Sequence, residues 1–232
     1  MQFQTHVAEI LVRAEKVKSF RFGRPPEFTY DPGQWIFVTI RADGEETTKH
    51  FSLSSCPTEE DYIEFTKRIT DHPFSLALDA LRPGDWASID GPHGRFTFSG
   101  QHPRVGMITG GIGITPMLSM IRYCTDMGAQ SRITLLYGSR SEGNIIFREE
   151  LAELERRNAL LKVVHCLSRP GDAWKGRRGH VSAQVIEEEI PDYRERVFYV
   201  SGPPALVADL TRALRTLGVP EDRIQREIFP GY

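Results

Sequence analysis

Short apolar and β-branched runs, separated by glycine- and proline-containing turns, occupy residues 3 to about 98. Runs of this length and spacing predict an antiparallel barrel or sandwich. One helix is expected at 75–81, with Ser75 as its N-cap, because a serine side chain can accept a hydrogen bond from the first helical N–H groups. The other runs predict strands at 5–14, 37–41, 50–54, 62–69 and 86–89.

From about Arg104 the pattern changes to apolar runs that alternate with segments of helical period. This alternation predicts a five-stranded parallel α/β sheet with helices on both faces, which binds ligands outside the carboxyl ends of its strands. We therefore expect two domains, at 1–100 and 101–232. The second is expected to hold strands at 104–109, 132–137, 161–167, 196–201 and 224–227 and helices at 116–127, 147–158, 181–189 and 204–217.

A glycine-rich turn, Gly110-Gly111-Ile112-Gly113, joins the first of these strands to the first helix. Such a turn presents bare backbone N–H groups, which bind phosphate. Pro116 fits the first helical turn, where an N–H group has no helical partner. Pro116 also stands where the dinucleotide fingerprint has a third glycine. The turn therefore predicts a nucleotide site without identifying the nucleotide.

The next strand ends in Ser139-Arg140 rather than in an acid that would bind a ribose 2′-hydroxyl. A hydroxyl followed by a guanidinium suits a 2′-phosphate, which favours NADPH over NADH. The competing interpretation is that Arg140 is a solvated loop residue. Arg148 is a further phosphate candidate, or simply a residue on an exposed helix face.

Composition excludes several functions. A net charge of −2 argues against a nucleic-acid partner, and no apolar run approaches the roughly 20 residues of a membrane span. The N-terminus lacks the pattern of a signal peptide, so we expect a cytoplasmic protein. Three scattered cysteines, Cys56, Cys124 and Cys166, are too few for an iron–sulfur cluster, and no metal site is expected.

Six motifs occur in one order along the chain, and each falls on a suitable element. They are Lys49-His50-Phe51-Ser52; Lys67-Arg68 with the segment 72–78; the segment 84–96, which contains Gly91-Pro92 and Gly94; the turn Gly110–Pro116; Ser201-Gly202-Pro203-Pro204; and the tail 227–232. In this combination the chain resembles the ferredoxin–NADP reductase family of flavoproteins over essentially its whole length. The resemblance implies an N-terminal FAD-binding β-barrel followed by a C-terminal NAD(P)-binding α/β domain.

The resemblance also implies roles for individual residues. Those implied to bind FAD are Lys49, His50, Phe51, Ser52, Thr66, Lys67, His72, Phe74, Ser75 and Tyr232. Those implied to bind NADP are Gly111, Gly113, Thr115, Pro116, Ser139, Arg140, Ser168, Arg169, Gly202 and Pro203. Phe51 would lie against the flavin ring in place of the family's tyrosine, and Lys49 would replace an arginine near the flavin phosphates.

Three residues are implied to be catalytic. Ser52 would donate a hydrogen bond near flavin N5. Ser201 would occupy the place of a family cysteine beside the nicotinamide, or would serve as a small residue that permits the turn before Gly202. Glu227 would assist proton movement or orient Ser52. Tyr232 or Phe229 would be the aromatic residue at the flavin face.

The implied activity is FAD-dependent NAD(P)H oxidation, with hydride transfer between NADPH and flavin N5 and single electrons passed to a separate carrier. Ferredoxin, flavodoxin or an oxygenase component would be that carrier. Two alternatives stay open: a flavin reductase that releases reduced flavin, and a non-catalytic nucleotide-binding module. Basic residues of the first half are a candidate docking surface for an acidic carrier: Arg13, Lys16, Lys18, Arg21 and Arg24.

Overall fold

The computed structural model describes residues 1–42 and 44–229. The chain separates into two compact units. The first comprises Met1–Ser99 together with Thr115–Tyr123, and the second comprises Gly100–Ile114 together with the chain from Cys124 onward. Within the described residues, the structure has no helix long and apolar enough to cross a membrane.

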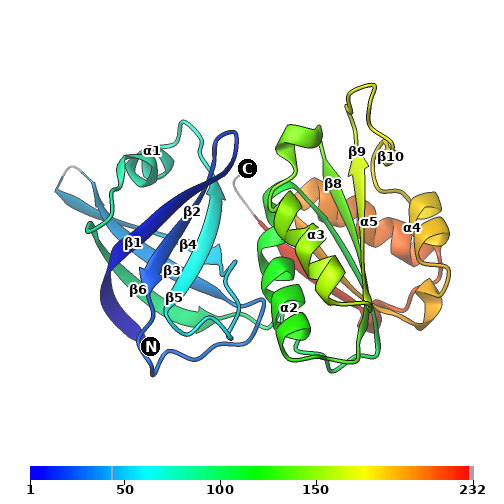
Figure 1. Cartoon of the computed structure of the whole chain (residues 1–232), viewed down its shortest axis with the longest axis horizontal. Helices are drawn as coiled ribbons and strands as arrows, with labels where there is room; N and C mark the ends of the chain where they lie inside the picture. Colours follow the sequence, from blue (N-terminus) through cyan, green and yellow to red (C-terminus); the bar gives the residue numbers. More distant parts are fainter. Residues whose placement is uncertain (43, 230–232) are drawn as a thin grey trace. The chain divides into compact units, whose positions relative to one another are not determined.

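The first unit is built on one curled antiparallel sheet of six strands, in the order β4-β3-β6-β1-β2-β5 (Figure 1). An isolated bridge between Leu53 and Phe65 links the end of β4 to β5, the other edge strand. The sheet therefore closes into a barrel. Of the two architectures predicted from the sequence, the barrel is the one observed. The strands are β1 (Gln2–Ala14), β2 (Val17–Gly23), β3 (Trp35–Ala42), β4 (Glu45–Ser52), β5 (Tyr62–Arg68) and β6 (Trp86–His93).

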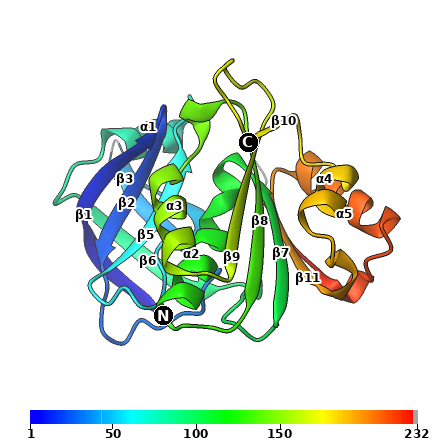
Figure 2. The same ribbon diagram turned by 45° about the vertical axis from the view of Figure 1, so that its right-hand side comes forward.

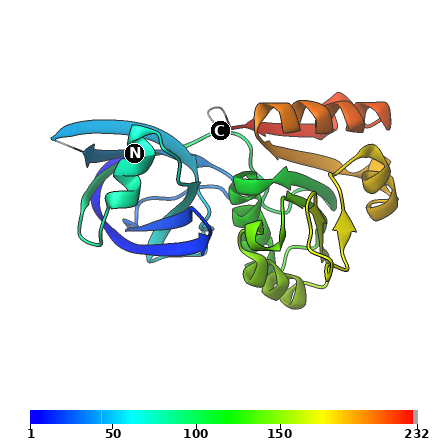
Figure 3. The same cartoon turned by 90° about the horizontal axis from the view of Figure 1, so that it is seen from above.

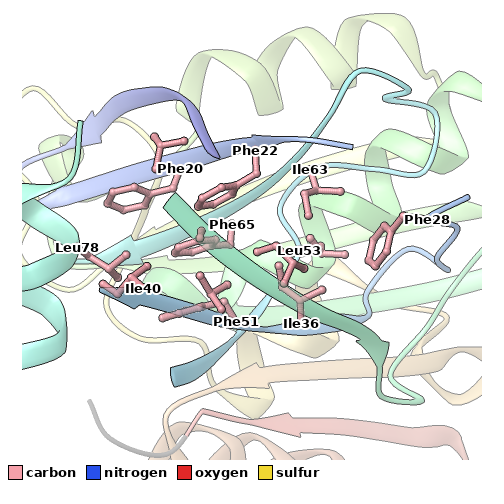
Figure 4. Packing of buried hydrophobic residues seen from close by; sticks show 14 of the residues in the cluster. Phe20, Phe22, Phe28, Ile36, Ile40, Phe51, Leu53, Ile63, Phe65 and Leu78 are labelled. Carbon is pink, nitrogen blue, oxygen red and sulfur yellow. The ribbon is translucent and has the colours of Figure 1, made fainter. Parts of the chain in front are cut away.

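Aromatic and β-branched side chains fill the barrel core, because alternate residues of each strand point inward (Figure 4). The rings of Phe20 and Phe22 on β2 both stack on Phe65 of β5, with centroids 5.2 and 5.8 Å away. Phe51 of β4 stacks on Phe65 at 4.3 Å. Phe65 thus joins three strands in the centre of the core.

The helix of this unit, α1 (Pro73–Ala80), begins earlier than predicted. Its N-cap is His72, which makes no side-chain capping bond, and Pro73 occupies the first helical position. The prediction of Ser75 as N-cap is therefore wrong. The helix begins at Pro73 because proline, which has no N–H, is well suited to the first helical position. The hydroxyl of Ser75 instead accepts a 2.8 Å hydrogen bond from the N–H of Thr70.

The second unit is a six-stranded parallel sheet in the order β10-β9-β8-β7-β11-β12. The helix α3 covers one face of the sheet, and α4 and α5 cover the other (Figures 2 and 3). The sixth strand, β10, pairs only Arg177 and Arg178 with β9 and was not predicted. The elements are β7 (Arg104–Gly110), β8 (Arg132–Ser139), α3 (Arg148–Arg157), β9 (Leu161–Leu167), β10 (Arg177–Arg178), α4 (Ala183–Glu189), β11 (Val197–Gly202), α5 (Pro204–Thr216) and β12 (Ile224–Ile228). The helix α2 (Ile114–Asp126) follows β7 in the chain, and most of it is grouped with the first unit.

Candidate functional site

The carboxyl ends of the parallel strands bring together segments that are far apart in the sequence. Ser201 on β11 pairs in register with Thr109 on β7 and with Glu227 on β12. Gly110, the last residue of β7, pairs with Gly138 on β8. The glycine turn, Ser201 and Glu227 therefore lie at one edge of the sheet, as the parallel arrangement predicts.

The glycine turn is packed tightly against the end of β11. Gly111 has a φ of 55°, and Gly111–Gly113 form a 3-10 turn that leads directly into α2. A Cβ atom on Gly113 would lie 2.6 Å from Thr109 Oγ1 and 2.8 Å from the Cα of Gly202. Gly113 therefore permits close packing of the turn, while Gly111 has open space and supplies the left-handed backbone. Thr115 and Pro116 lie buried in the first turn of α2.

The side chain of Ser201 is fully buried, and its hydroxyl is engaged within the sheet. It donates a 2.6 Å hydrogen bond to the carbonyl oxygen of Gly113, and Thr109 Oγ1 donates to the carbonyl oxygen of Ser201 at 2.9 Å. This geometry gives Ser201 a bracing role beneath the glycine turn. Gly202, at φ 140°, and Pro203, the N-cap of α5, complete this corner.

The ends of β8 and β9 carry two Ser-Arg dipeptides side by side. The N–H of Ser168 donates to the carbonyl of Ser139 at 3.1 Å, and the N–H of Arg169 donates to the carbonyl of Arg140 at 2.7 Å. Both arginines are exposed. The pairing places two guanidinium-bearing residues on adjacent loops, where an anionic group can be reached by both.

Two buried polar atoms at this end of the sheet have no hydrogen-bond partner: Ser139 Oγ and His165 Nδ1. Burial and the charge of Arg148 lower the pKa of His165 to about 4, so the imidazole is neutral at physiological pH. The nearby Tyr137 hydroxyl donates to the carbonyl of Gly111 at 2.9 Å. Sequence reasoning missed His165, because a single histidine within an apolar strand carries no distinguishing pattern.

In the basic segment after β9, neighbouring carboxylates offset the charge of Arg177. Arg177 forms ion pairs with Glu188 and Glu189 of α4, and these pairs raise the pKa of Arg177. Arg148 lies over the ring of Trp174, with its guanidinium carbon 5.8 Å from the ring centroid. Arg148 is exposed on α3, in agreement with the expectation of an exposed helix face, and its charge also acts on His165.

In the barrel, the residues of the Lys49–Ser52 motif alternate across β4. Phe51 is buried in the core, where its ring stacks on Phe65 (Figure 4). His50 points to the opposite face, 5.4 Å from the ring of Trp35. Lys49 is exposed, and Ser52, the last residue of the strand, is buried.

The surroundings of this motif include two lysines and the beginning of α1, an arrangement that suits an anionic group. Burial and the neighbouring charge of Lys49 lower the pKa of Lys67, so two cationic side chains lie close together here. In the same core, the ring of Phe74 lies 5.8 Å from that of Phe51. Phe74 and Ser75 are both buried within α1.

Thr66, which is expected to bind FAD, is buried on β5. Its hydroxyl is bonded to Ser19 Oγ at 2.7 Å and to Ser54 Oγ at 2.9 Å inside the barrel wall. Three of the five candidate docking cations form ion pairs. Arg13 and Arg21 pair with Glu64, and Lys18 pairs with Asp79. These pairs offset part of the positive charge of the candidate docking surface.

At the last strand, Glu227 is half-buried and paired with Ser201. Phe229 is buried, and its N–H donates to the carbonyl of Gly202 at 2.9 Å. Phe229 therefore closes the corner formed by the ends of β11 and β12. Tyr232 lies outside the described residues.

The side chains present fit FAD and a nicotinamide nucleotide. The paired lysines suit a diphosphate, and the Gly111–Gly113 turn leaves open space where a side chain on Gly111 would lie. The orphaned Ser139 Oγ and the two exposed arginines offer donors at the end of the sheet. When bound, FAD supplies a hydride acceptor that releases its electrons singly.

Comparison with known proteins agrees with this reading. Residues 5–98 match the oxidoreductase FAD-binding domain family, and residues 107–212 match the oxidoreductase NAD-binding domain family. Ferredoxin–NADP reductase B of Sorangium cellulosum (strain So ce56) is 32% identical over 226 residues, which cover 91% of this chain and 90% of that protein.

A glycine betaine monooxygenase reductase subunit of Pseudomonas aeruginosa (strain UCBPP-PA14) is 30% identical over 220 residues. These cover 92% of this chain but only 60% of that subunit, so the chain corresponds to part of the longer relative. A solved ferredoxin NADP+ reductase from Neisseria gonorrhoeae, with bound FAD and NADP, superposes with a TM-score of 0.84 at 18% identity and 98% coverage of both chains.

The predicted family, fold class and cofactor classes are thereby confirmed. The chain belongs to the ferredoxin–NADP reductase-like family of flavoproteins, which are flavin-dependent NAD(P)H oxidoreductases with an FAD-binding barrel and an NAD(P)-binding α/β domain.

Proposed function

We propose that this protein takes hydride from NADPH onto FAD and passes single electrons to a separate one-electron carrier, such as a ferredoxin, a flavodoxin or an oxygenase component. The observation that carries the coenzyme assignment is the pairing of the Ser139-Arg140 and Ser168-Arg169 dipeptides. Two exposed guanidinium groups on adjacent loops match the charge of a 2′-phosphate, whereas a 2′-hydroxyl gains little from them.

For the flavin, we assign Lys49 and Lys67 to its phosphates and Ser52 to a hydrogen bond near the reacting ring. The lowered pKa of Lys67 beside Lys49 supports the phosphate assignment. Phe51 keeps an aromatic surface at the motif, although one face of its ring is packed on Phe65. His72, Phe74 and Ser75 belong to the beginning of α1, near this core.

For the nicotinamide nucleotide, we assign the backbone of Gly111 and Gly113 to the pyrophosphate, with Thr115 and Pro116 extending the turn. Gly202 and Pro203 form the neighbouring corner. Ser201 and Glu227 are assigned to the nicotinamide end, where Ser201 acts by bracing the glycine turn and Glu227 offers a carboxylate on the adjacent strand.

The partner is proposed from the names of the relatives. They are named as reductases of ferredoxin and of a monooxygenase. On this support, onward electron transfer is assigned to a separate one-electron carrier.

A diaphorase assay tests the function. The purified protein is tested with NADPH or NADH, and with ferricyanide or an iron–sulfur carrier as acceptor, after its bound flavin has been quantified. Oxidation of NADPH with flavin retained on the protein supports the proposal. Loss of flavin on purification, with rapid reduction of added flavin, would favour the flavin reductase; absence of oxidation with every acceptor would favour a non-catalytic module.

A further inference from the structure

A closed ring of hydrogen bonds lies within the barrel wall, on the side of β1, β2 and β5 that faces away from the core. At its centre is Glu64, which has no solvent exposure. Its chain neighbours Ile63 and Phe65 belong to the core, so Glu64 points to the opposite face of β5. A carboxylate buried in this way requires partners for both of its oxygens.

The two carboxylate oxygens of Glu64 have separate partners. Oε2 accepts from Arg13 at 2.8 Å and from Arg21 at 2.9 Å. Oε1 accepts from the hydroxyl of Ser54 at 2.9 Å. Two guanidinium groups compensate the carboxylate charge at one oxygen, and the hydroxyl of Ser54 supplies the hydrogen bond that the other buried oxygen requires.

The ring is completed through three hydroxyl groups. Arg13 Nε donates to Ser19 Oγ at 2.8 Å, Ser19 Oγ lies 2.7 Å from Thr66 Oγ1, and Thr66 Oγ1 lies 2.9 Å from Ser54 Oγ. A guanidinium only donates and a carboxylate only accepts, so the three hydroxyls between them align in one direction. Such aligned networks reinforce one another in a low-dielectric environment.

The backbone of Glu64 holds the same segment. Its carbonyl accepts the N–H of Ser54 at 2.7 Å and the N–H of Ser55 at 3.2 Å. Its own N–H donates to Ser55 Oγ at 2.9 Å. The two residues that follow Leu53 are thus fixed to Glu64 through both backbone and side chain.

Only Leu53 separates this segment from Ser52, and Thr66 immediately precedes Lys67. We propose that Glu64 is a positioning residue for FAD: through Ser54 and Ser55 it holds the end of β4 against β5, so that Ser52 and Lys67 keep the spacing that the flavin requires. The inference rests on the assignment of Ser52 and Lys67 to the FAD site made above.

The test compares two serine substitutions in the same ring. Ser54→Ala removes the link between Glu64 and the Ser52 segment, whereas Ser19→Ala removes an equally buried hydroxyl that contacts only Arg13 and Thr66. FAD affinity is measured by titration of the apoprotein, amide hydrogen exchange is measured without FAD, and Tm is measured for both variants.

We expect Ser54→Ala to raise the Kd for FAD about tenfold, the effect of roughly one lost hydrogen bond, and to speed exchange at the amides of Ser54 and Ser55. Ser19→Ala should lower Tm by about as much as Ser54→Ala does, but it should leave the Kd for FAD within about twofold of the wild-type value. Ser54→Thr, which keeps the hydroxyl, should restore affinity. Glu64→Gln should behave like Ser54→Ala, with Glu9→Gln, in the exposed ion pair of Arg21, as its control.

Equal changes in Kd for Ser54→Ala and Ser19→Ala, or unchanged exchange and affinity in Ser54→Ala, would overturn the positioning role while leaving the proposed oxidoreductase intact. A wild-type apoprotein that takes up no FAD would overturn the site assignment, and this inference with it. If Ser54→Ala does not fold, it is replaced by Ser55→Ala, which removes the bond from the N–H of Glu64 to Ser55 Oγ in the same segment and is expected to weaken FAD binding likewise.

Discussion

The hydroxyl of Ser201 donates a 2.6 Å hydrogen bond to the carbonyl oxygen of Gly113. This bond joins the end of β11 to the glycine turn, the segment that we propose to present backbone N–H groups to the nucleotide. A position that the family resemblance assigns to hydride chemistry therefore also braces the proposed pyrophosphate site.

Replacing Ser201 by alanine tests this brace. Ser201→Ala leaves the carbonyl of Gly113 without its buried donor, so the free energy of unfolding should fall by about 1–3 kcal/mol, and the Kd for NADPH should rise severalfold. Urea unfolding and nucleotide titration measure both. Ser119→Ala, which removes a buried hydroxyl without a partner, should leave both nearly unchanged. A slower hydride transfer with unaltered NADPH affinity would show that Ser201 acts on the chemistry instead.

The close approach at Gly113 predicts a strong effect of a single methyl group. In Gly113→Ala the new Cβ would lie 2.6 Å from Thr109 Oγ1 and 2.8 Å from the carbonyl oxygen of Ser201. We expect a loss of about 2–3 kcal/mol in the free energy of unfolding, together with weaker NADPH binding. Gly143→Ala, where a Cβ meets nothing within 4 Å, is the control and should be nearly neutral. Comparable thermal shifts for the two variants would rule out the packing role.

Charge removal at the paired Ser-Arg dipeptides tests the coenzyme preference. Replacing Arg140 and Arg169 by alanine should lower kcat/KM for NADPH by about tenfold or more, since each charge-assisted bond to a phosphate contributes about 1.5–3 kcal/mol. The value for NADH should change little. Lys175→Ala, which removes an exposed charge from the loop after β9, should preserve the NADPH to NADH ratio. Parallel losses with both coenzymes would show that the arginines do not contact a 2′-phosphate.

The lowered pKa of His165 predicts an acid-dependent loss of stability. The unfolded chain protonates this histidine near pH 6.5 and the folded chain near pH 4, so the unfolded state binds the additional proton between these values. Stability should therefore be complete above about pH 6.5 and decrease as the pH falls toward 4.

In His165→Gln, the loss of unfolding free energy between pH 7 and pH 5 should be smaller than in the wild type by about 1–2 kcal/mol. Denaturant unfolding at the two pH values provides the measurement, and His180→Gln, at an exposed position, is the control. An identical pH dependence of His165→Gln and the wild type would mean that His165 is protonated as readily in the folded state as in the unfolded chain.

Much of the fold follows from local pattern. The apolar runs predicted the strands of the parallel sheet to within a few residues, because each run is bounded by a turn or a helical segment. The two-residue strand β10 was missed, since Arg177 and Arg178 have no apolar pattern and pair with β9 through position alone. The N-cap of α1 was misplaced at Ser75, because Pro73 two residues earlier already sets helical backbone geometry.

Much less of the site could be predicted from sequence. The order of the motifs pointed to the glycine turn and the Lys49–Ser52 segment, because the residues of each motif are adjacent in the sequence. The ring through Arg13, Ser19, Thr66, Ser54 and Glu64 joins four separate segments of the barrel, and its members become neighbours only through strand pairing. The same holds for the two Ser-Arg dipeptides, which are side by side because β8 and β9 are in register.

The central claim is tested most directly by mixing the FAD-loaded protein with NADPH in the absence of oxygen and following the absorbance of the flavin in a single turnover. The account predicts that the flavin band bleaches, and that half of the maximal rate is reached at a lower concentration of NADPH than of NADH. Persistence of the oxidised flavin spectrum with both coenzymes, in protein that retains FAD, would contradict it.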